Sequence, residues 1–522
     1  MLAAALAAGL ALVLDDRRRR VAAMLAAPVF AAAALTTLST ELPAAGARVA
    51  AGAAAGVVAV LVVAWLVHRW PATLALLAVG ALPFRVPVSI GDSAANLLLP
   101  LYAVIAGGVI AYAWRMLRSR EDDDEEPARE RMLTWLCRAF AAVLVLYGVQ
   151  ALYSTDVEQA VKNLCLFYVP FALLFLLLLE VRWSPLLLRR SLWVTVGLAL
   201  AFAAIGCVEF ATGHLLISNE KVVEANDLLP YFRVNSLFFD PNIYGRYLAL
   251  TMILLAAVLL WTRRRKEALL IAVALAVLWL GLLFSLSQSS FAALVLGLAV
   301  LAALRWRPWP VLAAAGAAGA VALALVLFAP GALNLETRSL DRVTSGRADL
   351  VGGGLSMVRD RPLLGFGSGS FAERFRERED VSSEKVAAAS HTIPLTVTAE
   401  QGIVGLAAYL ALVGLSLALL FGGLLGRLRS APWPGSSAVA RAGLAAAFCA
   451  LLLHTLVYAA YLEDPLSWVL LAIVAGLRLA PAEEPASAGS MTYGAGRAGS
   501  RAPAGLSTVR ASVPGLLDRP AE

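Results

Sequence analysis

The sequence predicts an all-α protein that crosses a membrane about 12 to 15 times, with a large, partly helical extracytoplasmic loop between late helices. Two observations lead to this prediction. Of the 522 residues, 60% are hydrophobic and 15% are charged, whereas about a quarter of the residues in a soluble domain are charged. The apolar residues also form long runs, such as residues 21–40 and 311–328, and a bilayer-spanning helix needs roughly 20 of them.

The expected spans follow one another along the chain and are separated mostly by short polar connections. We place them near residues 1–14, 21–40, 47–67, 71–83, 94–114, 132–152, 159–180, 190–211, 242–261, 267–285, 290–304, 309–329, 395–426, 441–461 and 465–480. The spans at 1–14 and 71–83 are short for a bilayer, so the total stays open between 12 and 15.

Basic residues divide sharply between the two sides that alternating spans define. The loops on one side hold 22 Lys and Arg, beginning with the run at 17–20, whereas the short loops opposite hold Arg48 and Arg85. An excess of Lys and Arg marks the cytoplasmic side of membrane proteins. The net charge of +7 is therefore explained by topology, and we expect no nucleic acid partner.

The chain is expected to divide into four parts. Residues 1–330 hold the N-terminal membrane helices, 331–394 an extracytoplasmic cap, 395–480 the C-terminal membrane helices, and 481–522 a disordered cytoplasmic tail rich in Ala, Gly, Ser, Pro and Arg. The cap segment contains nine basic and nine acidic residues. Because it is net neutral, particular arginines are expected to act there, and not a bulk positive field.

Polar residues interrupt the apolar pattern before the span near 242–261. Asp240 followed by Pro241 is typical of a helix N-cap with proline at the first helical position. The free N–H groups of a helix N-terminus favour anions, and here they lie near Asn242 with Arg233 and Arg246 on either side. The plainer interpretation is an interfacial arginine pair that binds lipid phosphates or carbonyl groups.

The cap segment contains a second group of candidates. Arg347 opens a short amphipathic helix in the prediction, and a guanidinium holds phosphate oxygens in a two-pronged way that lysine cannot copy. Gly365 and Gly367, in the stretch "GFGSG", either form a backbone nest for an anion or make a simple tight turn.

A third group lies where the span near 395 begins. His391 is one of four histidines in the chain, and neutral imidazole can take a proton near pH 7; the alternative is a capping histidine without chemistry. Glu400 lies about two turns inside the apolar helix, where an unpaired carboxylate is costly and is by default functional. It does not share a helical face with His391, so it is also interpreted as locking a loop by accepting hydrogen bonds.

The four cysteines point to no chemistry. Each of them, Cys137, Cys165, Cys207 and Cys449, lies inside an apolar run, a setting that fits neither a disulfide framework nor a zinc site.

Taken together, the polar segments resemble the O-antigen ligase / O-antigen polymerase family of bacterial membrane glycosyltransferases. The resemblance rests on "RVNSLFFDPNIYG" (233–245), "SLSQSSFAALVLG" (285–297), "SGRADL" and "RDRPLLGFGSGSF" (345–371), "SHTIPLTVTAEQGIVGL" (390–406) and, upstream, "LPFRVPVSIGDSAANLLLPLY" (82–102). One departure is Gln288, where many relatives have an arginine.

The resemblance implies a multi-pass enzyme of the bacterial plasma (inner) membrane, active on the extracytoplasmic face in surface polysaccharide assembly. The implied donor is a glycan linked to undecaprenyl pyrophosphate, and the acceptor is a hydroxyl of a glycan, of lipid A-core or of another molecule, with no cofactor and no metal. By resemblance, Arg233 and Arg347 bind the donor pyrophosphate and His391 is the base. Candidate substrate-binding residues around them are Arg246, Asp240, Asn242, Glu400, Gly365 and Gly367.

Two other classes of function remain open at this point. A transporter or flippase of lipid-linked oligosaccharide would need charges inside the bundle, where Arg138, Lys162 and Glu209 are the main candidates, and commonly has repeated halves, of which the sequence shows no convincing sign. A non-catalytic envelope-assembly partner would use the large loop for docking, and His391 would have no role in it. Ligase and polymerase are not separated by the residues.

Overall fold

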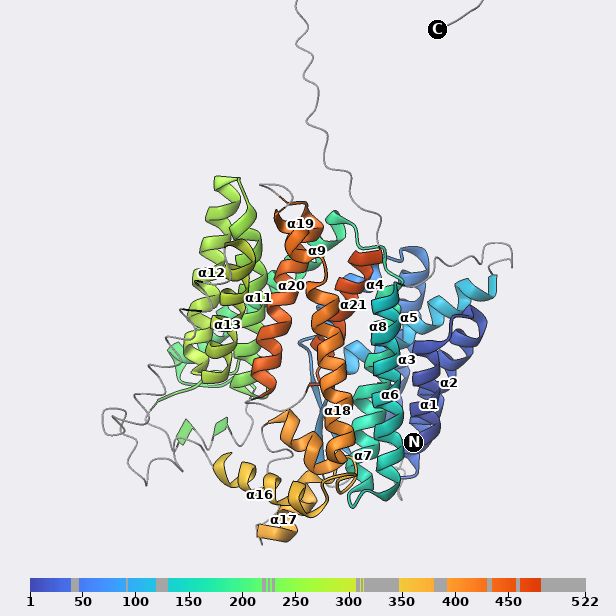
Figure 1. Ribbon diagram of the computed structural model, residues 1–522. Coiled ribbons are helices and arrows are strands. Elements are labelled where there is room, and N and C mark those ends of the chain that lie inside the picture. The colour runs from blue at the N-terminus through green and yellow to red at the C-terminus, as the bar shows by residue number, and fades with distance from the viewer. Residues whose placement is uncertain are drawn as a thin grey trace, which may run out of the picture. The chain divides into compact units, whose positions relative to one another are not determined.

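The computed structural model describes residues 1–38, 47–90, 93–118, 130–217, 222–223, 226–227, 231–306, 310, 313, 347–379, 392–429, 434–456 and 461–479. Within these residues the chain is almost entirely helical, as the fold class predicted, and residues Met1–Pro481 belong to one compact unit (Figure 1). The expected tail and nearly all of the expected span near 309–329 lie outside the described residues.

Helices in the first half of the chain follow the predicted spans closely. They are α1 (Leu2–Val13), α2 (Arg17–Thr36), α3 (Ala47–Arg69), α4 (Thr73–Ala81), α5 (Leu99–Arg118), α6 (Arg131–Gln150), α7 (Val157–Asn163), α8 (Val169–Leu179) and α9 (Pro185–Thr212). A π-helical segment, Leu164–Tyr168, joins α7 to α8. Capping residues define both ends of α9. The Ser184 hydroxyl accepts the Leu187 N–H at its start, and Gly213 ends the helix in the left-handed conformation.

The second half contains both the membrane helices that complete the bundle and the helices of the cap. They are α11 (Pro241–Trp261), α12 (Arg265–Ser285), α13 (Gln288–Arg305), α16 (Arg347–Asp360), α17 (Phe371–Glu379), α18 (Ile393–Phe421), α19 (Leu424–Arg429), α20 (Ser436–Thr455) and α21 (Pro465–Leu479). The α16 and α17 helices lie at the end of the bundle opposite α19 (Figure 1).

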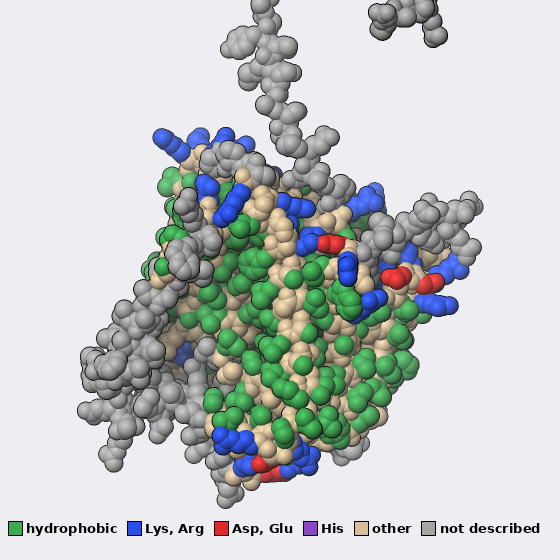
Figure 2. Space-filling model, in the orientation of Figure 1, with side chains coloured by type: hydrophobic (Ala, Val, Ile, Leu, Met, Phe, Trp, Pro, Cys, Tyr) green, Lys and Arg blue, Asp and Glu red, His purple; other side chains and the backbone are tan. Residues whose placement is uncertain are grey.

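Eleven helices of the described part of the chain are long and apolar enough to cross a membrane, and α1 and α21 are shorter apolar helices. This number indicates a multi-pass membrane protein. Figure 2 shows a broad band of apolar side chains on the visible face, with basic side chains near both ends of it.

A short β-hairpin is the one departure from the all-α prediction within the described residues. Strand β1 (Val86–Ile90) pairs in antiparallel fashion with β2 (Ser93–Leu97), and Val86 lies opposite Leu97. Two short strand-like runs separated by Gly91 and Asp92 are typical of a hairpin, so the hairpin could have been predicted from the sequence.

Arginines tie helix ends together at the end of the bundle that contains α19. Arg20, at the start of α2, lies 3.6 Å from Glu180, which follows α8. Arg478, near the end of α21, pairs with Glu130, which precedes α6. Arg441, near the start of α20, donates to the carbonyl oxygen of Gly422 at 3.0 Å. The loops that carry these residues all belong to the arginine-rich side of the predicted topology. The contacts place them at the same end of the bundle, as expected when successive spans alternate in direction.

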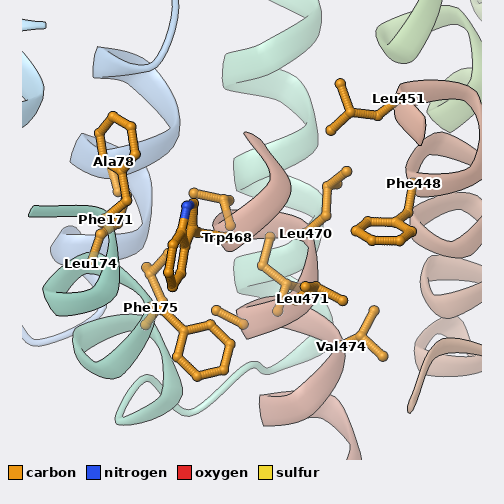
Figure 3. Close-up of a cluster of buried hydrophobic side chains, with 14 of the residues drawn as sticks. Ala78, Phe171, Leu174, Phe175, Phe448, Leu451, Trp468, Leu470, Leu471 and Val474 are labelled. Carbon is orange, nitrogen blue, oxygen red and sulfur yellow. The ribbon is translucent and has the colours of Figure 1, made fainter. Parts of the chain in front are cut away.

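The core of the bundle is built around α21. Trp468 is fully buried and stacks on Phe140 of α6 with ring centroids 4.2 Å apart, while its indole N–H donates to the carbonyl oxygen of Leu462. Figure 3 shows Trp468 beside Phe175 of α8, and Phe448 of α20 on the other side of α21. The helix that follows the Tyr461–Asp464 segment is therefore held rigidly among α6, α8 and α20.

Candidate functional site

The structure describes seven of the nine predicted site residues in full. They are Arg233, Asp240, Asn242, Arg246, Gly365, Gly367 and Glu400. Arg347 is described only as the first residue of α16, and His391 lies outside the described residues, one position before Thr392.

Arg233 lies in the segment that leads into α11 and contacts two other segments. Its Nε donates to the Ser285 carbonyl oxygen at 3.1 Å, and its Nη2 donates to Oδ1 of Asn242 at 3.4 Å. The backbone N–H and carbonyl of Arg233 both bond to the amide of Asn226. The guanidinium therefore lies between the end of α12 and the start of α11.

Glu209 of α9 holds the chain just after Arg233. Its buried carboxylate accepts the backbone N–H groups of Leu216, Asn235 and Ser236, the last at 2.7 Å. Ser236 has φ of +53°, which is uncommon for a residue other than glycine. Backbone strain of this kind concentrates at functional sites, and here the carboxylate compensates it.

The other two charges expected inside the spans also have local partners. Arg138 is exposed and lies over the ring of Trp135, and Lys162 pairs with Glu158 one helical turn away at 2.6 Å. The three charges thus belong to separate local interactions, which does not favour a charged path through the bundle.

The start of α11 agrees with the cap predicted from Asp240 and Pro241. Oδ1 of Asp240 accepts the N–H of Asn242 at 2.6 Å, and Pro241 is the first helical residue. The side chain of Asp240 therefore caps the helix that it precedes. Asn242 turns its side-chain oxygen toward both Arg233 and the hydroxyl of Ser287.

A buried turn rich in serine connects α12 to α13 and faces the start of α11. The Ser287 hydroxyl donates to Oδ1 of Asn242 at 2.8 Å, and Ser289 Oγ lies 3.2 Å from Nε2 of His454 on α20. Gly245 of α11 permits this approach, because a Cβ there would lie 2.9 Å from the hydroxyl oxygens of Ser285 and Ser290.

Sequence reasoning missed His454, which is fully buried. It stands in the apolar run "CALLLHTL", and an ionisable residue inside a membrane helix is by default functional.

Arg246, one and a half turns into α11, forms a buried ion pair with Asp464, which precedes α21. Arg246 is 3% exposed and Asp464 is 2% exposed, and Nε and Nη1 of Arg246 have no hydrogen-bond partner among the described residues. Oδ1 of Asp464 also accepts the Leu466 N–H at 2.9 Å. A cavity of about 20 Å³ adjoins the pair and is also lined by Arg85, which is room for about one water.

Glu400 accepts backbone hydrogen bonds from the glycine-rich turn, as its loop-locking interpretation predicted. Its two carboxylate oxygens accept the N–H groups of Gly369 at 2.9 Å and Phe371 at 3.2 Å. Gly365 and Gly367 have φ of +67° and +99°, and a Cβ on Gly365 would lie 2.3 Å from the Glu400 carbonyl group. The carboxyl group of Glu400 is thus the acceptor that this turn binds within the protein.

The turn docks where α18 is interrupted. Gly402 has φ of +65° and ψ of −165°, which breaks the helical hydrogen bonds. The N–H of Ile403 donates to the Pro362 carbonyl at 2.8 Å, and the Gln401 carbonyl accepts the side-chain amide of Gln150 at 3.1 Å. The turn and the end of α6 therefore replace the bonds that α18 lacks.

The cap helices form their own small core over the first turns of α18. It consists of Leu350, Met357, Phe366, Phe371, Phe375 and Ala399. Gly354 of α16 lies so close to Leu395 of α18 that a Cβ would approach Leu395 to 3.0 Å. The helix that Arg347 opens is therefore fixed to the helix that His391 precedes.

The last turn of α20 is the point at which the separate segments meet. His454 contacts Ser289 of the serine turn, and the Leu456 carbonyl accepts the hydroxyl hydrogen of Thr392 at 3.1 Å. Thr392 directly follows His391. The Arg233 segment and the start of α18 therefore connect to the same three residues, 454–456, at the C-terminal end of α20.

Two carboxylates outside the spans have perturbed acidity. Burial raises the pKa of Glu463 to about 7, against a smaller opposite effect of Arg85. Burial also raises the pKa of Glu373, assisted by Asp156 and Glu377. Within the described residues, no group of three or more His, Cys, Asp or Glu side chains is arranged to hold a metal ion.

Comparison with known proteins supports the family that the motifs indicated. Residues 273–410 match the family model described as O-antigen ligase. The matched range begins within α12, passes through the cap and ends within α18, and it includes Arg347, His391 and Glu400. The search of curated proteins gives no match.

Proposed function

We propose that this chain, a member of the O-antigen ligase/polymerase family, transfers a glycan from undecaprenyl pyrophosphate to a hydroxyl acceptor. The reaction takes place at the extracytoplasmic face of the bacterial plasma membrane. The arginine-rich end of the bundle that contains α19 faces the cytoplasm, and the end that contains α16, α17 and the start of α18 faces outward.

The observation that supports this proposal most directly is the meeting of segments at the last turn of α20. Arg233 is connected to His454 through Asn242, Ser287 and Ser289, and Thr392 is bonded to Leu456. A guanidinium and the residue after His391 are thereby joined by one rigid helix end. Clamping a pyrophosphate beside a base requires such an arrangement.

The chemistry follows from the needs of the donor. The acceptor hydroxyl is a poor nucleophile until a base removes its proton, and His391 takes that proton. The acceptor oxygen then forms a bond to the anomeric carbon while the bond from that carbon to the pyrophosphate oxygen breaks. Undecaprenyl pyrophosphate leaves with the electron pair, and its growing negative charge is stabilised by Arg233 and Arg347.

Arg246 and Glu400 have supporting parts in this proposal. Arg246 lies one turn after Asn242 and pairs with Asp464, so it fixes the start of α11 to the segment that precedes α21. Glu400 holds the glycine-rich turn, and with it the cap, against α18. Asp240 fixes the start of α11.

The test uses cells that lack the chromosomal copy and express variants of this chain. Arg233→Ala and His391→Ala should each abolish the transferred glycan while the protein still inserts. Removing one stabilising donor typically costs about 10²–10³ in rate, and removing a general base costs about 10²–10⁴. Arg264→Ala is the matched control, because Arg264 is an exposed arginine at the start of α12, paired with Glu267.

Gel profiles of the surface glycans read the result. Single repeats without longer chains indicate a polymerase, and intact polymer left on undecaprenyl pyrophosphate indicates a ligase. A normal profile in both variants, with protein levels unchanged, would refute the proposed function.

A further inference from the structure

The ring of His454 on α20 is connected to Arg233 by side chains of α13 and α11. We propose that His454 is a positioning residue that fixes the guanidinium of Arg233 through Ser289, Ser287 and Asn242. This inference rests on the proposed function only in taking Arg233 as a group that binds the donor pyrophosphate.

The connection is a continuous series of contacts between side chains. Nε2 of His454 lies 3.2 Å from Ser289 Oγ, which lies 3.2 Å from Ser287 Oγ. The Ser287 hydroxyl donates to Oδ1 of Asn242 at 2.8 Å, and Nη2 of Arg233 donates to the same oxygen at 3.4 Å. Four segments take part: α20, the start of α13, the start of α11 and the segment before α11.

The series is buried at its α20 end, whereas Asn242 and Arg233 at its other end are half-buried. His454 and Ser287 are fully buried, and Ser289 is 7% exposed. Inside a membrane bundle a buried polar group must find its partner within the protein. Loss of one of these three buried members therefore leaves its neighbours to find new partners within the protein, which they can do only by moving.

The orientation of Asn242 is the step through which His454 reaches Arg233. A guanidinium only donates hydrogen bonds, so the amide of Asn242 must present its oxygen, and not its NH₂ group, to Arg233. The Ser287 hydroxyl favours that same orientation by donating to the same oxygen. A shift of Ser287 would allow the amide to rotate and present an NH₂ group to the guanidinium.

Substitutions at 454 separate the hydrogen bond from the shape of the ring. Phenylalanine has a similar shape but cannot make the contact with Ser289, while glutamine keeps a donor and an acceptor.

The alternative is that His454 only fills space between helices. In that case Phe at 454 would be tolerated, or would lower stability without a specific effect on pyrophosphate binding. Thr455→Val is the matched control, because the Thr455 hydroxyl lies in the same turn and donates to Leu452 of its own helix.

The probe is undecaprenyl pyrophosphate alone, titrated onto purified protein in nanodiscs. His454→Phe should weaken its binding by about fivefold or more, as loss of one buried hydrogen bond does, and His454→Gln should stay within about twofold of the unchanged protein. Combined with Asn242→Ala, His454→Phe should add nothing further. Full additivity of the two substitutions, or equal weakening by Gln and Phe, would overturn the inference.

Hydrogen–deuterium exchange over residues 240–246 separates this inference from the proposed function. If the unchanged protein does not bind undecaprenyl pyrophosphate, the proposed function fails. Faster exchange there in His454→Phe, but not in Thr455→Val or His454→Gln, would still support the positioning role. Unchanged exchange would contradict it.

Discussion

The hydroxyl of Thr392 donates a hydrogen bond to the carbonyl oxygen of Leu456 at 3.1 Å, and so joins the start of α18 to the end of α20. Helix carbonyls near a C-terminus lack partners within the helix, so this contact also satisfies Leu456. It is made by the residue that directly follows His391.

Thr392 offers a direct test of that junction. Thr392→Val removes the hydroxyl and keeps the shape, and we expect it to lower the rate of glycan transfer by roughly threefold to tenfold, as a hydrogen bond of about 0.5–1.5 kcal/mol implies. Thr392→Ser keeps the hydroxyl and should retain most of the rate. Equal rates for Val and Ser, measured on purified protein, would show that the bond does not position the base.

Gly245 is expected to tolerate no side chain. Gly245→Ala would place a Cβ 2.9 Å from two serine hydroxyls and 3.1 Å from Ser287 Cβ, and overpacking of this kind costs about 1–3 kcal/mol. We expect a lower melting temperature together with a loss of transfer. Gly197→Ala in α9 is the control, because a Cβ there meets nothing within 4 Å; a drop of the same size in both variants would contradict this prediction.

Glu400 is expected to hold the cap. Glu400→Ala leaves the N–H groups of Gly369 and Phe371 without their acceptor, and each such buried group costs about 1–3 kcal/mol. Faster hydrogen exchange and easier proteolysis over residues 362–371 should follow, with a smaller change for Glu400→Gln, which keeps one acceptor oxygen. Protection equal to that of the unchanged protein would show that the turn is held by other contacts.

Glu463 predicts a dependence of stability on pH. Its pKa in the folded protein is raised to about 7 by burial, whereas an unfolded glutamate titrates near about 4.3. The folded state therefore keeps a proton that the unfolded state releases, and stability falls as pH rises between these two values. Glu463→Gln should flatten this fall when melting temperatures in detergent are compared from pH 4.5 to 8. An unchanged slope would exclude Glu463 as its source.

Much of the fold was predictable because lipid as a solvent leaves few choices. Long apolar runs must become helices that satisfy their own backbone, and the described helices lie close to the expected spans. The hairpin at Val86–Leu97 was missed because its strands are short and lie beside much stronger apolar runs.

The candidate site was predictable in its residues but not in its partners. The N-cap at Asp240 and the polar character of Glu400 are local features of the sequence. Asp464 and His454, by contrast, can be recognised as site residues only through their partners. These partners, Arg246 and Ser289 respectively, are distant in sequence. The break at Gly402 could not be foreseen, because glycine is frequent inside membrane helices and only the docked turn makes its conformation necessary.

The ion pair between Arg246 and Asp464 has a consequence for how the protein is made. Arg246 enters the membrane with α11, long before the ribosome has synthesised Asp464 and α21. A lone arginine in a bilayer is costly, so the early bundle must keep this charge hydrated or shielded until α21 is inserted. Synthesis that stops before α21 leaves a bundle with an exposed cation, a defect that quality-control proteases of the membrane can recognise.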